Sequence, residues 1–97
     1  METVATATVK VGIPSALRDR TGGRRWVTAS GRTVRDLIAS LERDYPGLAF
    51  NVCYETGELR EFVNIFVGEE NVRYLQGLDT PISSGQAVHI IHSVAGG

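Results

Sequence analysis

Cysteine is almost absent from this chain, which contains only Cys53. A single cysteine forms no internal disulfide and builds no cluster of thiolate ligands around a metal ion. Long apolar runs are also missing, and no stretch approaches the roughly 18 residues of a membrane-spanning helix. The first ten residues lack the charged start and apolar core of a signal peptide. We therefore expect a soluble, cytoplasmic protein that binds no metal and has no membrane partner.

A surplus of positive charge is missing too, because 10 basic residues face 11 acidic ones and the formal net charge is -1. Nucleic-acid-binding domains of this size usually carry a basic surplus, since phosphate neutralisation supplies most of their affinity. We expect no nucleic-acid partner. The sequence also shows no Ser-His-Asp set and no phosphate-cradling glycine loop. It therefore predicts a protein that is not an enzyme and binds no cofactor.

Several stretches alternate apolar and polar residues with the period of two that half-buried strands require. In the first of them the apolar residues share one parity, and Pro14 ends the run because proline donates no hydrogen bond to a ladder. Glycines at the Thr21-Gly22-Gly23 tip suit a tight turn. The predicted strands are residues 4–13, 24–29, 60–67 and 86–94, with a shorter one at 72–74.

One clear helix lies between the second and third strands. Thr33 is a good N-cap, Asp36 suits a variant of the capping box, and Pro46-Gly47 ends the helical pattern. Its apolar stripe consists of Val34, Leu37, Ile38, Leu41 and Tyr45. An amphipathic helix must bury this stripe, and the sheet is the available partner. Residues 48–58 carry no clear pattern.

The order of these elements predicts the fold class α+β, with the β-grasp plan of a mixed sheet packed on one main helix. A length of 97 residues with 42% hydrophobic residues allows one modest core. We expect residues 1–97 to form a single domain. The last four residues, Val94-Ala95-Gly96-Gly97, should form a flexible tail because two glycines bring no side chain to pack.

Several motifs carry a resemblance to a known family: Ile13-Pro14, Thr21-Gly22-Gly23, Gly31 with Thr33 and Leu37, residues 59–67, and Val94-Ala95-Gly96-Gly97. Together they cover nearly the whole chain, which resembles the ThiS/MoaD sulfur carriers of the ubiquitin-like superfamily. The segment 62–67 and the tail are most similar to the actinobacterial members that supply sulfur for cysteine biosynthesis.

The resemblance implies that the working group is the carboxylate of Gly97. An E1-like partner enzyme would adenylate it with ATP, and a sulfur donor would displace AMP to leave a thiocarboxylate. Val94, Ala95 and Gly96 would be recognised by that enzyme, and a second partner enzyme would accept the sulfur. Cysteine, molybdopterin, thiazole and thiolated metabolites are all open as products. The alternative is a ubiquitin-like modifier conjugated through Gly97 to lysines.

A partner surface is predicted around Phe62, Ile65 and Phe66, because both parities of residues 62–67 are largely apolar and the helix covers only one sheet face. The alternative is that residues 75–82 fold over that face. Other side chains have plainer interpretations. Trp26 is predicted in the core or the hairpin packing, and Cys53 as a buried thiol. His89 and His92 should point to opposite faces, while Arg18, Arg20, Arg24 and Arg25 should form a solvated rim.

Overall fold

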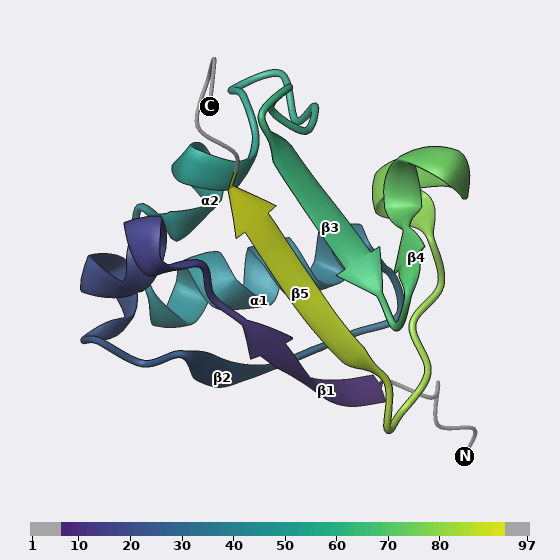
Figure 1. The fold of residues 1–97 in the computed structure, drawn as a ribbon, viewed down its shortest axis with the longest axis horizontal. Helices are drawn as coiled ribbons and strands as arrows, with labels where there is room; N and C mark the ends of the chain where they lie inside the picture. The colour runs from purple at the N-terminus through teal and green to yellow at the C-terminus, as the bar shows by residue number, and fades with distance from the viewer. Residues whose placement is uncertain (1–6, 93–97) are drawn as a thin grey trace.

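A five-stranded mixed sheet forms the centre of the protein, which is seen in a computed structural model that describes residues 7–92. The elements in chain order, with η for a 3-10 helix, are β1 (Ala7–Gly12), η1 (Ser15–Thr21), β2 (Trp26–Gly31), α1 (Val34–Asp44), α2 (Leu48–Val52), β3 (Val63–Val67), β4 (Glu70–Asn71), η2 (Val72–Tyr74), η3 (Gly77–Asp79) and β5 (Ala87–His92) (Figure 1).

The strands lie in the order β2-β1-β5-β3-β4. β1 and β5 run parallel in the middle of the sheet, and the other neighbouring strands are antiparallel. The two halves of the chain therefore meet along the first and last strands, as Figure 1 shows. This is a β-grasp fold, as predicted, and the strand that precedes the C-terminal tail is held by neighbours on both sides.

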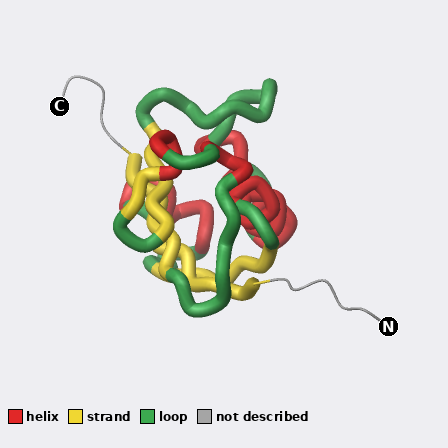
Figure 2. The backbone as a smooth tube through the Cα atoms, turned by 90° about the vertical axis from the view of Figure 1, so that its right-hand side faces the viewer, coloured by secondary structure: helices red, strands yellow, loops and turns green. Residues whose placement is uncertain are grey.

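The core lies between one face of the sheet and α1, and Figure 2 shows the sheet curving around the helices. Alternation along the strands sends every second side chain inward. The inward side chains include Val9, Val11, Ile65, Val67, Val88 and Ile90 from the strands, and Val34, Leu37, Ile38 and Leu41 from α1. Tyr45 packs against this cluster and is partly buried. The predicted helix stripe is thus confirmed.

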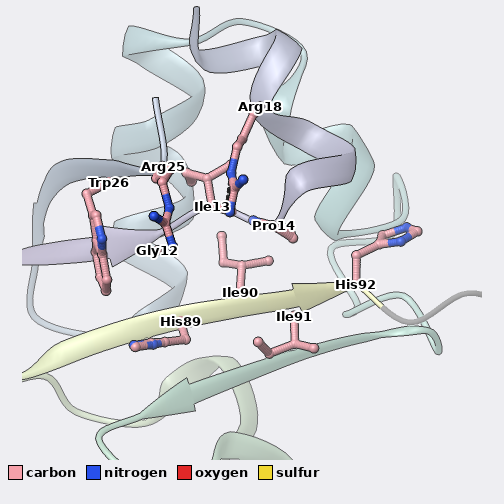
Figure 3. Close-up of a pocket in the computed structure, with 10 residues that line it drawn as sticks. All are labelled: Gly12, Ile13, Pro14, Arg18, Arg25, Trp26, His89, Ile90, Ile91 and His92. Atoms are coloured by element: carbon pink, nitrogen blue, oxygen red, sulfur yellow. Dashed lines mark hydrogen bonds between the residues drawn. The ribbon is translucent and has the colours of Figure 1, made fainter. Parts of the chain in front are cut away.

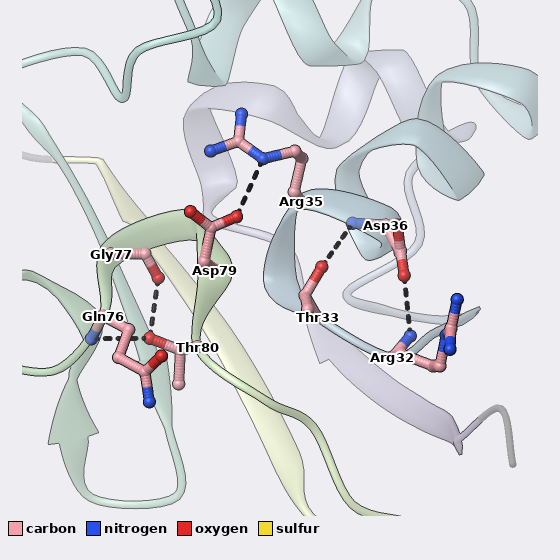
Figure 4. Close-up of polar contacts among 8 residues, drawn as sticks. All are labelled: Arg32, Thr33, Arg35, Asp36, Gln76, Gly77, Asp79 and Thr80. Carbon is pink, nitrogen blue, oxygen red and sulfur yellow. Dashed lines mark hydrogen bonds and ion pairs between the residues drawn. The ribbon is translucent and has the colours of Figure 1, made fainter.

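Side-chain caps fix the start of α1. Thr33 Oγ1 accepts a hydrogen bond of 3.3 Å from the Asp36 backbone N–H, as the predicted N-cap requires. The Asp36 carboxylate reaches back to the backbone N–H of Arg32 at 2.9 Å, rather than to that of the cap residue itself (Figure 4). Both bonds hold the turn between β2 and the helix in one geometry.

Residues 75–82 pack against the start of α1 and leave the other face of the sheet open. The Val34 N–H donates to the Thr80 carbonyl at 3.1 Å, and the Ile82 N–H donates to the Arg32 carbonyl at 3.0 Å. An exposed ion pair of 3.2 Å joins Arg35 to Asp79 (Figure 4). The segment therefore does not cover the open face as a whole, where Trp26 and Ile91 stay exposed, although Leu75 borders a hollow beside Phe66 at its edge.

A second helix, α2, follows α1 in the stretch that showed no pattern. Gly47 takes a left-handed φ of 97°, and the Glu42 carboxylate accepts hydrogen bonds from the N–H groups of Gly47 and Ala49. These bonds hold the pKa of Glu42 below its usual value. Leu48 and Val52 are fully buried. Five residues give a single turn, which is too short for helical periodicity to show.

Other element boundaries differ from the sequence-based predictions. Residues 15–21 form the 3-10 helix η1 rather than an irregular loop, and residues 72–74 form η2 rather than a strand. The pairing strand β4 lies just before, at Glu70–Asn71. The glycines of the predicted tip, Gly22 and Gly23, do take positive φ values of 67° and 87°.

Gly31 gives a direct test of how closely β2 and α1 pack. An added Cβ there would overlap the Cβ of Asp36 and lie 3.1 Å from backbone atoms of Asp36 and Leu37. We expect Gly31→Ala to lower the free energy of unfolding by about 1–3 kcal/mol, because backbone on both sides must move. Urea unfolding measures this. Thr28→Ala, exposed on the same strand, is the control, and equal stability of the two variants would contradict the packing.

Candidate docking face and tail exit

The open face of the sheet carries the side chains that alternate with the core. The β3–β5 register sets Phe66 opposite His89 and Asn64 opposite Ile91. Phe62 lies in the turn just before β3 and is 43% exposed, while Ile91 is 44% exposed. Phe66 is half-buried. Large apolar side chains therefore reach solvent on this face.

Ile65 does not belong to this face. It is 1% exposed and packs in the core with Val63 and Val67, on the side of the sheet that α1 covers. Because side chains alternate along a strand, the parity that places Phe66 outside must place Ile65 inside. The predicted position of Ile65 on the partner surface is wrong, whereas Phe66 has the outward parity and Phe62, in the turn before β3, is exposed.

Trp26 extends the open face across β1 and is not a core residue, because its side chain is 43% exposed. Its ring meets the His89 ring edge-on, with centroids 5.1 Å apart at 65°, and Lys10 Nζ lies 5.2 Å from the indole centroid. Gly12 pairs with Trp26 in the ladder, and a Cβ there would lie 3.3 Å from the indole. The glycine thus leaves room for the ring to cross.

A hollow of about 240 Å³ opens beside the end of β5, where β1 turns away. The β1–β5 ladder stops at the pair Gly12 and His89, so among residues 7–92 the last residues of β5 have no strand on that side. The Arg18 Nε–H donates to the Ile13 carbonyl at 3.0 Å along the rim (Figure 3). The hollow is lined by Gly12, Ile13, Pro14, Arg18, Arg25, Trp26, His89, Ile90, Ile91 and His92.

The chain leaves this hollow at His92, the last residue of β5. The predicted attachment residue Gly97 and the predicted recognition residues Val94, Ala95 and Gly96 lie outside the described residues. What the structure does place is their starting point, at the end of a strand in the interior of the sheet, next to the open face.

Trp26 and Ile91 were not singled out as surface residues by the sequence analysis, although a signal was present. Trp26 shares its parity with the polar Thr28, while Val27 and Ala29 hold the core parity. Ile91 likewise alternates with the buried Ile90. Strict parity would have placed both side chains on the open face, whereas the hollow itself depends on the β1–β5 register and has no local signal.

The remaining candidates agree with their plainer interpretations. Cys53 is buried, and burial raises the pKa of its thiol while the charges of Arg35 and Arg60 oppose this only in part. A protonated, enclosed thiol is a poor nucleophile. Figure 3 shows His89 and His92 pointing to opposite sides of β5, as predicted. His89 Nε2 is buried and has no hydrogen-bond partner among the described residues.

Two further observations concern only residues 7–92. None of their helices has the length and apolarity needed to cross a bilayer. No three or more His, Cys, Asp or Glu side chains in this part of the chain come together in a group able to hold a metal ion. The described surface offers docking features rather than a set of reacting groups.

Comparison with known proteins gives concordant matches. The ThiS family matches residues 11–97. The sulfur carrier protein CysO of Mycobacterium tuberculosis is 44% identical over 91 residues, which covers 92% of this chain and 98% of that protein.

Solved structures of similar proteins share the fold. A chain in the Amycolatopsis orientalis BexX/CysO complex superposes with a TM-score of 0.86 and 37% identity, covering 92% of this chain and 99% of that one. The small archaeal modifier protein 1 of Methanosarcina acetivorans gives a TM-score of 0.82 and 31% identity, covering 97% of this chain and 100% of that one.

Proposed function

We propose, since the chain belongs to the ThiS family, that it is a sulfur carrier that works through the carboxylate of Gly97. The observation that carries this proposal is the family match itself, because it runs through residue 97 and so includes the whole tail. The chain acts as a carrier and supplies no catalytic base. Its place of action is the cytoplasm, where ATP is available to the activating enzyme.

The chemistry follows from the weakness of a carboxylate as an electrophile. An E1-like enzyme lets a Gly97 carboxylate oxygen attack the α-phosphate of ATP, which releases pyrophosphate and leaves an acyl-adenylate. Hydrosulfide, or a donor at the same oxidation level, then attacks the acyl carbon and expels AMP. The product is a thiocarboxylate, whose sulfur passes to an acceptor enzyme. ATP belongs to the partner, and this chain binds no cofactor of its own.

The fold supports this use because the tail continues from β5, which pairs with β1 as far as His89 and with β3 as far as His92. A partner that docks on the open face therefore lies at a fixed position relative to the start of the tail. Val94, Ala95 and Gly96 pass into the activating enzyme's channel, where any Cβ on Gly96 would collide with the wall. Phe62 and Phe66 belong to the docking face and Ile91 joins them.

The docking face has a matched test. We expect Phe62→Asp to reduce kcat/KM for activation about tenfold or more, because burying a new carboxylate in an apolar interface is unfavourable. ATP–pyrophosphate exchange with the E1-like enzyme measures it. The control is Phe50→Asp, since Phe50 is 59% exposed and lies on α2. Equal activity of both variants, with the fold intact, would contradict the assignment.

A protein modifier is the second candidate, and the match to small archaeal modifier protein 1 favours it. Both functions need the same tail and the same adenylation. They differ in the product, because a modifier forms an isopeptide bond between Gly97 and a lysine. Peptide mass spectrometry of proteins from the source cells distinguishes them: lysines carrying the tail indicate a modifier, and a free thiocarboxylate indicates a carrier.

The acceptor is the finer question within the carrier function. The similarity to CysO proteins makes cysteine biosynthesis the first pathway to test, ahead of molybdopterin, thiazole and thiolated metabolites. Incubation of the loaded carrier with each candidate acceptor enzyme, followed by detection of the sulfur-containing product, decides among them. The carrier proposal itself is tested by sulfur loading of Gly97, and that measurement needs no acceptor enzyme.

A further inference from the structure

We propose that the hollow beside the end of β5 binds an extended acidic segment of the activating enzyme, with a carboxylate side chain next to an apolar one. The inference rests on the proposed function, because it names the chemistry of that enzyme's docking element. It adds a charged contact at the tail exit to the apolar contacts of the open face.

Charge points to an acidic occupant. The hollow is lined by two arginines and two histidines and by no acidic residue. In the described part of the chain the one ion pair is that of Arg35 with Asp79, so neither Arg18 nor Arg25 has a carboxylate within 4.0 Å there. Two guanidinium groups at one hollow favour a carboxylate, which they bind with paired, charge-assisted hydrogen bonds.

Arg18 is already held in position. Its Nε–H donates to the Ile13 carbonyl at 3.0 Å, which fixes the side chain along the rim of the hollow (Figure 3). The two terminal nitrogens make no hydrogen bond to residues 7–92. A side chain ordered before binding loses less conformational entropy when its partner arrives. The terminal nitrogens of Arg18 are therefore positioned to donate hydrogen bonds to a carboxylate of another protein.

The size and walls of the hollow favour a peptide over a small-molecule cofactor. Its volume of about 240 Å³ is below the roughly 300–1,000 Å³ of ordinary ligand pockets. Trp26 and Ile91 supply exposed apolar surface beside the arginines. One apolar side chain and one carboxylate, adjacent in a segment, match these two kinds of wall.

The backbone of β5 favours an extended conformation for that segment. Because the β1–β5 ladder stops at Gly12 and His89, the edge of β5 beyond it faces the hollow instead of a strand. A free strand edge presents N–H and C=O groups to a chain lying alongside. A segment bound there touches His92 and so sets the direction in which the tail enters the enzyme.

The test compares charge reversals at matched positions. We expect Arg25→Glu to raise the KM for the carrier about tenfold in ATP–pyrophosphate exchange, with kcat little changed, since charge at a docking site acts on association. Arg43→Glu makes the same change on the exposed last turn of α1 and should leave KM within about twofold. The wild-type KM should rise with salt more steeply than that of Arg25→Glu. Circular dichroism checks that each variant is folded.

The outcomes separate this inference from the proposed function. If Arg25→Glu and Arg43→Glu behave alike while the wild type is activated and the protein without Gly97 is not, the hollow does not bind the enzyme and the carrier function stands. If the wild type itself is never adenylated, the proposed function fails first, and this inference fails with it. If sedimentation shows a dimer that Arg25→Glu dissociates, a second copy occupies the hollow and the inference is overturned. Recovery of KM when an acidic residue of the enzyme is changed to arginine opposite Arg25→Glu would confirm the pair.

Discussion

Deleting Gly97 should abolish sulfur loading in a reaction reconstituted with the E1-like enzyme, ATP and sulfide. Each residue of extended chain spans about 3.3–3.6 Å, so the shortened tail stops one such step before the nucleotide. Reacting atoms must approach to about 3–3.5 Å, and a misplacement of 1 Å can cost about a hundredfold in rate. The loss should therefore exceed a hundredfold, measured as thiocarboxylate formed per minute.

The same deletion should leave the fold almost unchanged. Gly97 has no side chain to bury, and surface changes of this kind usually alter the free energy of unfolding by no more than about 0.5 kcal/mol. A variant with one extra glycine after Gly97 is the matched control, since it keeps every native residue of the tail and only moves the carboxylate one step too far, so its loading should also fail. Sulfur loading of the truncated protein, or sulfur found on Cys53, would contradict the mechanism.

Ile65→Ala should lower the free energy of unfolding by about 2–5 kcal/mol, the range for emptying a well-packed aliphatic site. Ile65 is 1% exposed in the middle of β3, among core side chains that have little freedom to collapse into the space. The change removes core volume and leaves the open face as it was. Its effect on activation should be explained by unfolding alone.

Urea unfolding of Ile65→Ala and Phe62→Ala separates core from surface. The midpoint should fall strongly for the first, with an unchanged slope, and the second should cost about 1 kcal/mol or less because Phe62 is 43% exposed. The kcat/KM for activation of the folded protein should instead fall more for Phe62→Ala than for Ile65→Ala. A destabilisation by Phe62→Ala as large as that by Ile65→Ala would place both residues in the core and contradict the described face.

These two residues also show where sequence reasoning stops. The strand and helix periods gave the β-grasp plan, the α1 stripe and the Thr33 cap correctly. In residues 62–67, however, Phe62 and Phe66 make the second parity largely apolar despite the polar Asn64, so the pattern predicts a strand without fixing which side faces the helix. Only pairing with β5 on one side and the position of α1 decide that Ile65 points inward and Phe66 outward.

The hollow at the tail exit was beyond sequence reasoning for a related reason. Its lining comes from the end of β1, from η1, from the start of β2 and from β5, which the parallel β1–β5 register brings together. Arg18 and Arg25 are seven positions apart in the chain and were interpreted as a solvated rim. Nothing in local composition distinguishes a rim arginine from one that borders a hollow.

The tail differs from the hollow, because its proposed role rests on the sequence and the family match and not on the structure. Gly97 and the residues before it lie outside the described residues, and the structure contributes the position from which they start. The match of the ThiS family through residue 97 makes the carboxylate the natural reaction centre.

The most direct measurement is the intact mass of the protein after incubation with the E1-like enzyme, ATP and sulfide. We expect a gain equal to the difference between one sulfur and one oxygen atom, dependent on ATP and located at Gly97 by fragmentation of the C-terminal peptide. A gain on Cys53, or enzyme that is active on another carrier yet leaves this mass unchanged, would contradict it.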